Sequence, residues 1–577
     1  MIAPNVVLTA AHNIYNNSKK IEASLIEFIV ECNGNEYKDS SKCKRVYYPK
    51  AYKDGDDYED YGLLILESNL GETYGYIGIC NEEKINSEVE YNVYGYPADK
   101  VRNKHKCFEL WGMKGKGLKI QGGSRDVIEY NTIDTYGGQS GSPIYYIEEG
   151  FCYVVGVHVS GGGLVNEGTY LNKSRFTQIQ KWMIDSGIQG IAEEECNVSE
   201  IKELVLNKKN LSDYAIKYLS FFSLPELNKL VLSENNISEN SGKFFSKMHY
   251  PKLQELYLNR NSLLDKGVEF FSICKFENLT KLILSRNGIT AEGMKHICNA
   301  RFPNLVQLNL DENKIGEEGM KVFMESNNFT NLEFIVLENC ELKDKGVEYF
   351  LRSNIPKIAT IFLENNQITE KGFEKFKENE NKFSNLKTFR MNKNQIRDKG
   401  LEFIANTFLP KLQFLEICEN EIGIQGAIIL FTSLKQRELT DIYLNRNKIG
   451  EGNPDDFTSL SKTNLMFLKN LYLANNYIQD NFLVEFSKGN LPKLQNLQLN
   501  ENFISDLGVV SLCSSKFTLL QKLDLSKNSI GDSSCDAICT SSFKNTISKI
   551  NLGKNNFSDE GKKKIQSVYI HYKASFY

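Results

Sequence analysis

One spacing of apolar residues recurs through the second half of this chain and constrains its fold more than any other feature. The pattern LxxLxLxxNxI appears in fourteen copies, in steps of 26 to 29 residues. Alternating leucines predict a short strand that buries one face, and intervening segments such as AEGMKHI predict a helix. Because one copy is too small to bury its own apolar face, successive copies must stack into a continuous core. The copies begin at Ile201, Leu227, Leu253, Leu279, Leu305, Leu332, Ile358, Leu386, Leu412, Leu439, Leu468, Leu494, Leu520 and Ile547.

An asparagine follows the strand in twelve of the fourteen copies, with Lys209 and Cys340 as the exceptions. Its amide can hydrogen-bond to buried backbone groups of adjacent turns. The loss of this asparagine at Lys209 suits an atypical first repeat that caps the array. The pattern resembles leucine-rich repeats, and its long period resembles the ribonuclease-inhibitor-like subclass. This resemblance implies a curved α/β solenoid with strands on the concave face and helices on the convex face.

Three segments of the first half supply a base, a carboxylate and a nucleophile in that order. They are LTAAH ending at His12, DYGLLIL beginning at Asp60, and GGQSGSP carrying Ser140. A serine hydroxyl becomes a nucleophile when an imidazole takes its proton, and a buried carboxylate orients that imidazole. Asp57 is an alternative for the carboxylate, but only Asp60 directly precedes the apolar strand GLLIL. The glycines around Ser140 allow the amides of Gly138 and Ser140 to point at one spot and hold an oxyanion.

The chain order His, Asp, Ser resembles chymotrypsin-like serine proteases. The resemblance implies an all-β double-barrel, trypsin-like domain, which needs no metal or organic cofactor. Only eleven residues precede His12. We therefore expect the first strands of the barrel to be missing, so that the domain is N-terminally incomplete.

The segments YGYPADK, DTYGGQSGSP and VVGVHVSGG narrow the resemblance to bacterial glutamyl endopeptidases. That resemblance implies that Thr135 and His158 line the specificity pocket and donate hydrogen bonds to an acidic side chain, so that cleavage follows Glu or Asp. Asp134 stands where trypsin-like enzymes keep a carboxylate for Arg and Lys, which leaves basic specificity as an alternative.

Positions between the strand leucines should face the concave side of the solenoid, and several of them are aromatic. Exposed aromatic side chains interleaved with charge are typical of protein-binding surfaces. We therefore expect a protein ligand there, although a long array also exposes varied residues without binding anything. The candidate residues are Tyr257, Phe362, Tyr443 and Tyr472.

Composition excludes several other classes. A net charge of −4, from 69 basic and 73 acidic residues, carries no nucleic-acid signature. No apolar run is long enough for a membrane span. The thirteen cysteines form no CxxC pair or Cys–His cluster, so no metal site is indicated. The compartment stays open: secreted or vacuolar if an export signal lies upstream, and otherwise cytoplasmic.

These observations divide the chain into a protease domain at 1–187, a linker at 188–200, repeats at 201–557 and a capping helix at 558–577. The first hypothesis is a serine endopeptidase that acts on a protein or peptide substrate and uses its repeats to bind a protein. The alternative is a non-catalytic repeat protein that carries an incomplete protease remnant.

Overall fold

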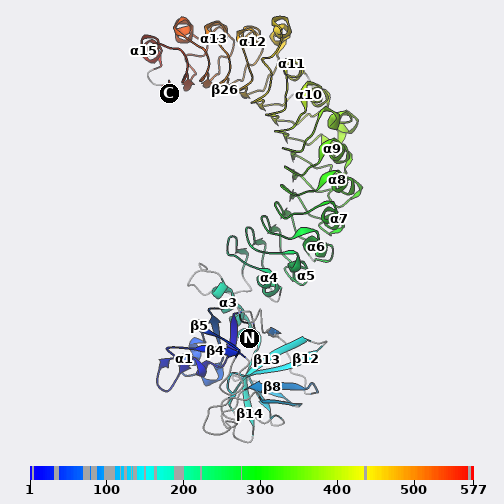
Figure 1. The fold of residues 1–577 in the computed structure, drawn as a ribbon, viewed down its shortest axis with the longest axis vertical. Coiled ribbons are helices and arrows are strands. Elements are labelled where there is room, and N and C mark those ends of the chain that lie inside the picture. Colours follow the sequence, from blue (N-terminus) through cyan, green and yellow to red (C-terminus); the bar gives the residue numbers. More distant parts are fainter. Residues whose placement is uncertain are drawn as a thin grey trace. The chain divides into compact units, whose positions relative to one another are not determined.

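The computed structural model describes residues 1–2, 5–30, 38–68, 70, 78–79, 88–95, 111–116, 118–121, 126–130, 133, 139–148, 151–160, 165–187, 201–220, 224–274, 276–433, 438–569 and 573–576. The chain divides into two compact units, Met1–Ile201 and Lys202–Tyr577. Figure 1 shows the elements of both units, coloured along the sequence.

The first unit is built from antiparallel β-sheet in two halves. Among its described residues, one sheet has the strand order β1-β6-β5-β4. The other has the order β10-β11-β14-β13-β12-β8-β9, and β7 pairs with β13. This is the all-β arrangement expected from the sequence. The strands are β1 (Val6–Thr9), β2 (Tyr15–Asn16), β3 (Ile21–Glu22), β4 (Glu27–Val30), β5 (Asp39–Tyr47), β6 (Gly62–Leu66), β7 (Gly78–Ile79), β8 (Tyr91–Gly95), β9 (Trp111–Gly115), β10 (Lys119–Gln121), β11 (Val127–Tyr130), β12 (Pro143–Glu148), β13 (Phe151–Ser160) and β14 (Asn166–Tyr170).

Each sheet of the first unit has its own apolar core. The core of the first sheet includes Val7, Ile14, Leu64 and Leu66, and that of the second includes Tyr91, Val93, Ile128, Ile144 and Val155. The short helical elements are η1 (Ala11–Asn13), α1 (Lys50–Lys53) and η2 (Asp57–Glu59), and the long helix is α3 (Lys173–Gly187).

Helix α3 is fastened to the first sheet through an aromatic cluster. Trp182 stacks on Tyr47 at a centroid distance of 5.9 Å and lies 5.6 Å from Tyr61. The tryptophan is buried. Aromatic pairs at this distance add to the stabilisation that comes from buried area alone. The last helix of the unit is therefore part of its core.

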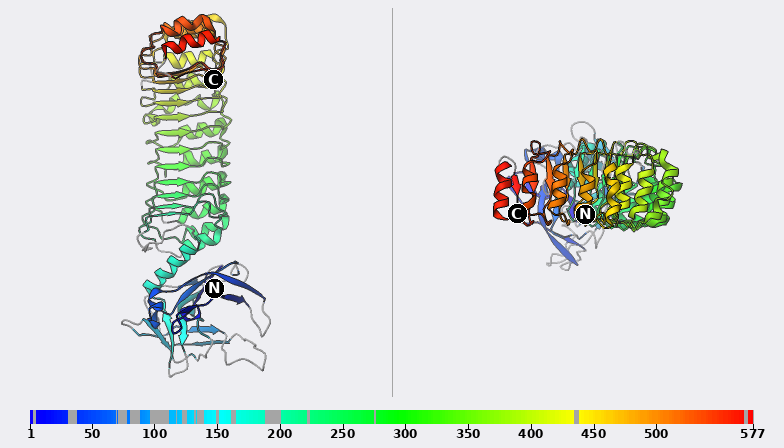
Figure 2. Two further views of the ribbon diagram at one scale, coloured as in Figure 1. Left: turned by 90° about the vertical axis from the view of Figure 1, so that its left-hand side faces the viewer. Right: turned by 90° about the horizontal axis from the view of Figure 1, so that it is seen from above.

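The second unit is a single parallel sheet backed by helices. Its described residues form fifteen strands in chain order, β15 to β29. Figure 1 shows the strands along the inner side of this curved array and the helices on its outer side, and Figure 2 shows the strands stacked as a ladder. The strands are β15 (Glu203–Val205), β16 (Lys229–Val231), β17 (Glu255–Tyr257), β18 (Lys281–Ile283), β19 (Gln307–Asn309), β20 (Phe334–Val336), β21 (Thr360–Phe362), β22 (Thr388–Arg390), β23 (Phe414–Glu416), β24 (Asp441–Tyr443), β25 (Asn470–Tyr472), β26 (Asn496–Gln498), β27 (Lys522–Asp524), β28 (Lys549–Asn551) and β29 (Lys573–Ser575).

The outer elements are a mixture of α-helices and 3-10 helices. They are α4 (Asp213–Leu219), η5 (Glu239–Ser241), α5 (Gly242–Phe245), α6 (Leu264–Glu269), η6 (Phe270–Ile273), α7 (Ala291–Asn299), α8 (Gly316–Glu325), α9 (Lys343–Arg352), η7 (Glu370–Phe373), η8 (Lys377–Phe383), α10 (Arg397–Asn406), α11 (Ile424–Thr432), η9 (Pro454–Lys462), α12 (Asp480–Phe486), α13 (Asp506–Cys513), η10 (Asp532–Ser534), α14 (Cys535–Cys539) and α15 (Asp559–Val568).

The repeated asparagine forms a buried ladder through the array. Asn366 Nδ2 donates to the backbone oxygens of Leu337 (2.7 Å) and Leu363 (3.0 Å), and its Oδ1 accepts from the Cys340 amide (2.9 Å). The backbone N–H of Asn366 donates to Asn394 Oδ1 at 2.9 Å. Each asparagine thus pairs backbone groups of two turns, which would otherwise be buried without partners.

Cys340 occupies the place of the asparagine in the sixth repeat. Its thiol lies 3.2 Å from the Leu310 carbonyl oxygen and 3.3 Å from that of Glu338. A thiol is a weak donor. The ladder therefore continues through this repeat with a weaker rung.

The C-terminal segment differs from the helix expected over 558–577. Helix α15 ends at Val568, and β29 then pairs in parallel with β28. This short strand pairs the outer backbone groups of β28, the strand of the last leucine-rich copy. The segment therefore caps the array with a strand as well as with a helix.

We expect Asn366→Ala to destabilise the second unit by about 3 kcal/mol, because several buried backbone groups lose their partners. Asn381→Ala, at an exposed position of the same repeat, is the matched control and should cost much less. Urea unfolding followed by far-ultraviolet circular dichroism measures the difference. Equal effects of the two substitutions would contradict a structural role for the ladder.

Candidate active site

His12 and Asp60 are brought together by the pairing of two strands. β1 pairs with β6 so that Thr9 lies opposite Gly62, which places the residues just beyond each strand side by side. His12 Nδ1 lies 2.6 Å from Asp60 Oδ2, and the His12 amide donates to Asp60 Oδ1 at 2.9 Å. The Asp60 side chain is 10% exposed and that of His12 is 34% exposed. A buried carboxylate thus orients a solvent-accessible imidazole, as a general base requires.

The backbone around Asp60 is held by residues of the second sheet and of α3. Thr169 on β14 donates its hydroxyl proton to the Asp60 carbonyl oxygen at 3.1 Å. Arg175 is 4% exposed, and its guanidinium is 2.8 Å from Glu59 Oε1 and 3.1 Å from the Tyr58 carbonyl oxygen. Arg175 fixes the turn that precedes Asp60, because both of these acceptors belong to it.

The same guanidinium also reaches the second sheet. Arg175 Nη1 donates to the carbonyl oxygens of Asp126 (2.7 Å) and Tyr170 (2.9 Å). One buried cation therefore joins the turn before Asp60 to the opposite half of the domain. A buried charge of this kind is stable only when it is fully paired.

Ser140 lies in a tight turn that Asn13 attaches to the first sheet. Asn13 Nδ2 donates to the Ser140 carbonyl oxygen at 3.0 Å and to Thr9 Oγ1 at 3.0 Å. Gly141 adopts φ +94°, and a Cβ there would lie 2.5 Å from Thr9 Oγ1. Only glycine fits this position, both for its backbone angle and for its space. The turn thus holds Ser140 next to Asn13, the residue that follows His12.

The hydroxyl of Ser140 donates to the Val159 carbonyl oxygen at 3.1 Å. In this conformation its proton points at a carbonyl, and its hydrogen bond to His12 is not formed. Catalytic hydrogen bonds often close only when substrate is bound. Gly138, the other expected oxyanion donor, lies outside the described residues.

His158 is a buried, neutral histidine held by Tyr130. Its Nδ1 lies 2.5 Å from Tyr130 Oη, and the residue is 2% exposed. Burial lowers the pKa of His158 to about 4; a hydrogen bond with the Glu167 backbone opposes this shift, and the charge of His12 adds to it. Burial also raises the pKa of Tyr130, so its hydroxyl keeps its proton and donates to the ring. Thr135 and Asp134, the other expected specificity residues, lie outside the described residues.

The expected partner-binding residues stand on four strands of the second unit and are half-buried against neighbouring side chains. Tyr443 and Tyr472 stack with their centroids 4.1 Å apart and their planes within 9°. Phe362 packs edge-on against Phe334 at 5.2 Å. The Tyr257 hydroxyl donates to Glu255 Oε2 at 2.7 Å.

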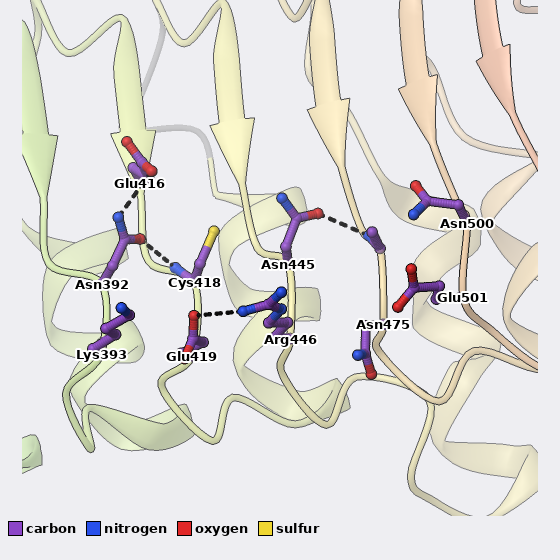
Figure 3. Close-up of a pocket in the computed structure, with 11 residues that line it drawn as sticks. Asn392, Lys393, Glu416, Cys418, Glu419, Asn445, Arg446, Asn475, Asn500 and Glu501 are labelled. Carbon is purple, nitrogen blue, oxygen red and sulfur yellow. Dashed lines mark hydrogen bonds and ion pairs between the residues drawn. The ribbon is translucent and has the colours of Figure 1, made fainter.

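A groove of about 340 Å³ lies over β22 to β26 of the second unit (Figure 3). Its polar lining is mostly paired within itself. Asn392 donates to Glu416 at 2.8 Å, and Arg446 donates to Glu419 at 3.2 Å. Asn445 accepts from the Ala474 amide at 2.8 Å.

Sequence reasoning missed four residues of this site: Asn13, Tyr130, Thr169 and Arg175. Asn13 directly follows His12, and its contact with Ser140 crosses 127 residues of chain. Arg175 in α3 carried one weak signal, which is its position beside apolar residues of the helix. An arginine in such a position is either exposed or, if buried, fully paired. Neither motif nor periodicity indicates the partners of these side chains.

Within the described part of the chain, no three His, Cys, Asp or Glu side chains are arranged to hold a metal ion. In the same residues, no helix combines the length and apolar character needed to span a bilayer.

Comparisons with known proteins assign both units. Residues 1–183 match the family model described as Trypsin, and residues 277–298, 303–324, 384–405 and 518–539 match the Leucine Rich repeat model. The chain therefore carries a trypsin-like domain followed by leucine-rich repeats, as the sequence predicts.

Two curated relatives match the first unit. Glutamyl endopeptidase of Bacillus licheniformis is 31% identical over 192 residues, which cover 32% of this chain and 58% of the relative. A Bacillus subtilis protein named extracellular metalloprotease is 30% identical over 188 residues, covering 32% of this chain and 56% of the relative. The chain thus spans less than two thirds of either relative.

Among solved structures, a Glu endopeptidase in complex with MPD is 26% identical to this chain, with a TM-score of 0.28. The match covers 32% of this chain and 82% of that chain.

We expect Arg175→Met to destabilise the first unit by about 3 to 5 kcal/mol, because it leaves Glu59 and three carbonyl oxygens without their cation. Lys173→Met, at an exposed position of the same helix, is the matched control and should change little. Both tryptophans of the chain, Trp111 and Trp182, lie in this unit, so their fluorescence reports its unfolding in the intact protein. Similar unfolding midpoints for the two variants would contradict the role assigned to Arg175.

The low pKa of His158 predicts that the first unit loses stability in acid. The unfolded chain binds a proton at pH 6.5, whereas folded His158 resists it until about pH 4. Stability from this group is therefore present above pH 6.5 and falls by about 3 kcal/mol as the pH drops to 4. Tryptophan-detected unfolding should show a shallower pH dependence in His158→Gln, and an unchanged one in His249→Gln. An identical slope for His158→Gln and wild type would sink this assignment.

Proposed function

We propose that the chain is a serine endopeptidase that works through an acyl-enzyme. The single observation that carries this proposal is the 2.6 Å contact between His12 and Asp60, beside a nucleophile turn that Asn13 tethers to the same segment. Ser140 attacks the peptide carbonyl while His12 takes its proton. His12 then passes that proton to the leaving amine, and water releases the acyl group by the same route.

Two groups assist the reaction in this proposal. Asp60 keeps the His12 ring oriented and stabilises its charged form. The amides of Gly138 and Ser140 hold the oxyanion, and one such donor is worth about 3 kcal/mol in the transition state. His12 sits at the exposed end of the pair, which leaves room for a substrate.

We further propose that cleavage follows Glu or Asp. The likeness to a glutamyl endopeptidase supports this, with Thr135 and His158 as donors to the acidic side chain. Neutral His158 carries a single ring N–H, and in this role that group would donate to the substrate instead of to the Glu167 backbone. Basic specificity through Asp134 is the competing assignment.

The repeats are proposed to bind a protein on their strand-bearing face. Stacked Tyr443 and Tyr472 and the aromatic residues Tyr257 and Phe362 supply the large, stiff side chains that dominate protein interfaces. The proposal retains the division into a protease at 1–187, a linker at 188–200, repeats at 201–557 and a capping segment at 558–577.

Paired fluorogenic peptides that end in Glu or Arg test the catalytic proposal. We expect hydrolysis after Glu, and a loss of about 10⁴-fold or more in Ser140→Ala. His158→Gln should raise KM for the Glu peptide more than it lowers kcat, because it removes a binding donor rather than a reacting group.

The other outcomes discriminate between the competing assignments. Hydrolysis after Arg that is lost in Asp134→Asn would transfer the specificity to Asp134. A folded protein that cleaves neither peptide would favour the alternative, a repeat protein with a protease remnant.

A further inference from the structure

Three carboxylates occupy equivalent places in three consecutive repeats. Asp311, Glu338 and Glu364 each lie two residues beyond the end of strands β19, β20 and β21. These strands pair in parallel, with Leu308 beside Ile335 and Ile335 beside Ile361. Parallel strands lie about 4.8 Å apart, so the three acidic side chains form one continuous line. We call these three residues the acid row.

The acid row is partly buried and incompletely paired. Glu364 is 6% exposed; Arg390 forms an ion pair with it, but no hydrogen bond of good geometry reaches either of its carboxylate oxygens or Asp311 Oδ1. Burial, and then the charge of Glu338, raises the pKa of Glu364 to about 7. Burial likewise raises the pKa of Asp311 and of Glu338, where a neighbouring carboxylate adds to the effect. The free protein therefore holds negative charge here at a cost.

One end of the acid row already holds a cation that the chain supplies itself. Arg390 Nε lies 2.8 Å from Glu364 Oε1 and 2.8 Å from Glu416 Oε2. Its guanidinium carbon lies 4.4 Å from the centre of the Phe362 ring. A guanidinium between two carboxylates and over an aromatic face is a favourable arrangement for arginine. This is the binding mode that the surface provides.

The other end of the acid row lacks an equivalent cation among the described residues. The cations that lower the pKa values of the row are Arg286 and Arg390. Arg286 is already ion-paired with Glu312, and Arg390 is shared by Glu364 and Glu416. Phe334 begins strand β20, and its ring packs against Phe362, 5.2 Å away. At this end of the row carboxylates are thus present, while the guanidinium is missing.

We propose that the acid row binds the guanidinium group of an arginine side chain from a protein partner, centred on Glu338 between Asp311 and Glu364. This inference rests on the proposed role of the strand-bearing face in protein binding and names the chemistry of the partner. Charge complementarity selects the occupant, because the row carries three carboxylates, while Arg286 and Arg390 are each also paired with a glutamate outside the row. A planar guanidinium can also pair with two carboxylate oxygens at once.

The groove of Figure 3 is a weaker place for a charged ligand. It mixes Lys393 and Arg446 with Glu416, Glu419 and Glu501, so its lining does not select one sign of charge. Arg446 and Glu419 neutralise each other at 3.2 Å.

The test measures binding of a fluorescein-labelled peptide, Gly-(Arg-Ser)₃-Gly, by fluorescence anisotropy. The protein is the full chain carrying Ser140→Ala, so that the peptide stays intact. An otherwise identical peptide with citrulline in place of arginine keeps the shape and removes the charge. We expect the arginine peptide to bind at least about tenfold more tightly than the citrulline peptide.

Matched variants locate the binding site. Glu338→Gln leaves both ion pairs of Arg390 intact and should weaken binding about tenfold, and Glu338→Gln with Glu364→Gln should weaken it further. Glu374→Gln with Glu378→Gln removes the same charge as the double variant, from exposed positions of the repeat that holds Glu364. This control should leave binding unchanged. The Glu338→Gln variant should melt no lower than its parent, because the charge that it removes is costly in the free protein.

Three results would overturn the inference: equal binding of the arginine and citrulline peptides, no effect of Glu338→Gln, or equal effects of the acid-row and control variants. Binding that is weakened only by Tyr443→Ala with Tyr472→Ala would keep the strand-bearing face as a binding surface and reject the acid row. Because catalysis is absent from this assay, its failure is distinct from failure of the proposed peptidase.

Discussion

Buried backbone groups at the strand ends of every repeat need partners, and the second unit depends on meeting that need. One asparagine side chain per turn supplies both a donor and an acceptor, as Asn366 does between Leu337, Leu363 and Cys340. With the inner wall fixed in this way, leucines fill the core and the outer helices vary in length and type without disturbing the strands. The residues at the strand ends are then free to carry charge, which is how the acid row arises.

The first unit meets the same need with a cation. Its two sheets approach where the turn before Asp60 exposes carbonyl oxygens, and Arg175 satisfies them from both sides. Asn13 does the equivalent work for the Ser140 turn. The candidate triad is therefore held less by its own members than by polar residues around it, and Ser140 itself remains bonded to Val159. An arrangement of this kind fixes the backbone while leaving the reacting hydroxyl able to change partners.

Much of this structure could be predicted from local sequence patterns. The rest depends on contacts between residues that are far apart in the chain. The leucine spacing predicted the strands of the solenoid, because each strand and its buried face lie within a few residues of chain. The motifs around His12 and Asp60 point to two residues whose side chains lie 2.6 Å apart, and their catalytic roles stay a prediction. The contacts of Arg175 with Glu59 and of Asn13 with Ser140 cross 116 and 127 residues, and no local signal indicates them. Strand β29 was missed because KAS carries no leucine pattern, and the assignments of Asp134, Thr135 and Gly138 lie outside the described residues.

The ladder also bears on how such an array can evolve. Because nearly every repeat presents the same asparagine side chain to its neighbours, the packing of the core does not depend on the order of the repeats. Whole repeats can therefore be duplicated or lost at little energetic cost. The chemistry of the surface, in contrast, does depend on the order of the repeats. Losing the repeat that holds Glu338 would bring Asp311 beside Glu364 and Arg390, leaving two acidic side chains and one basic one in a shorter line. Ligand preference in this solenoid can therefore change in steps of one whole repeat, without any substitution of a contacting residue.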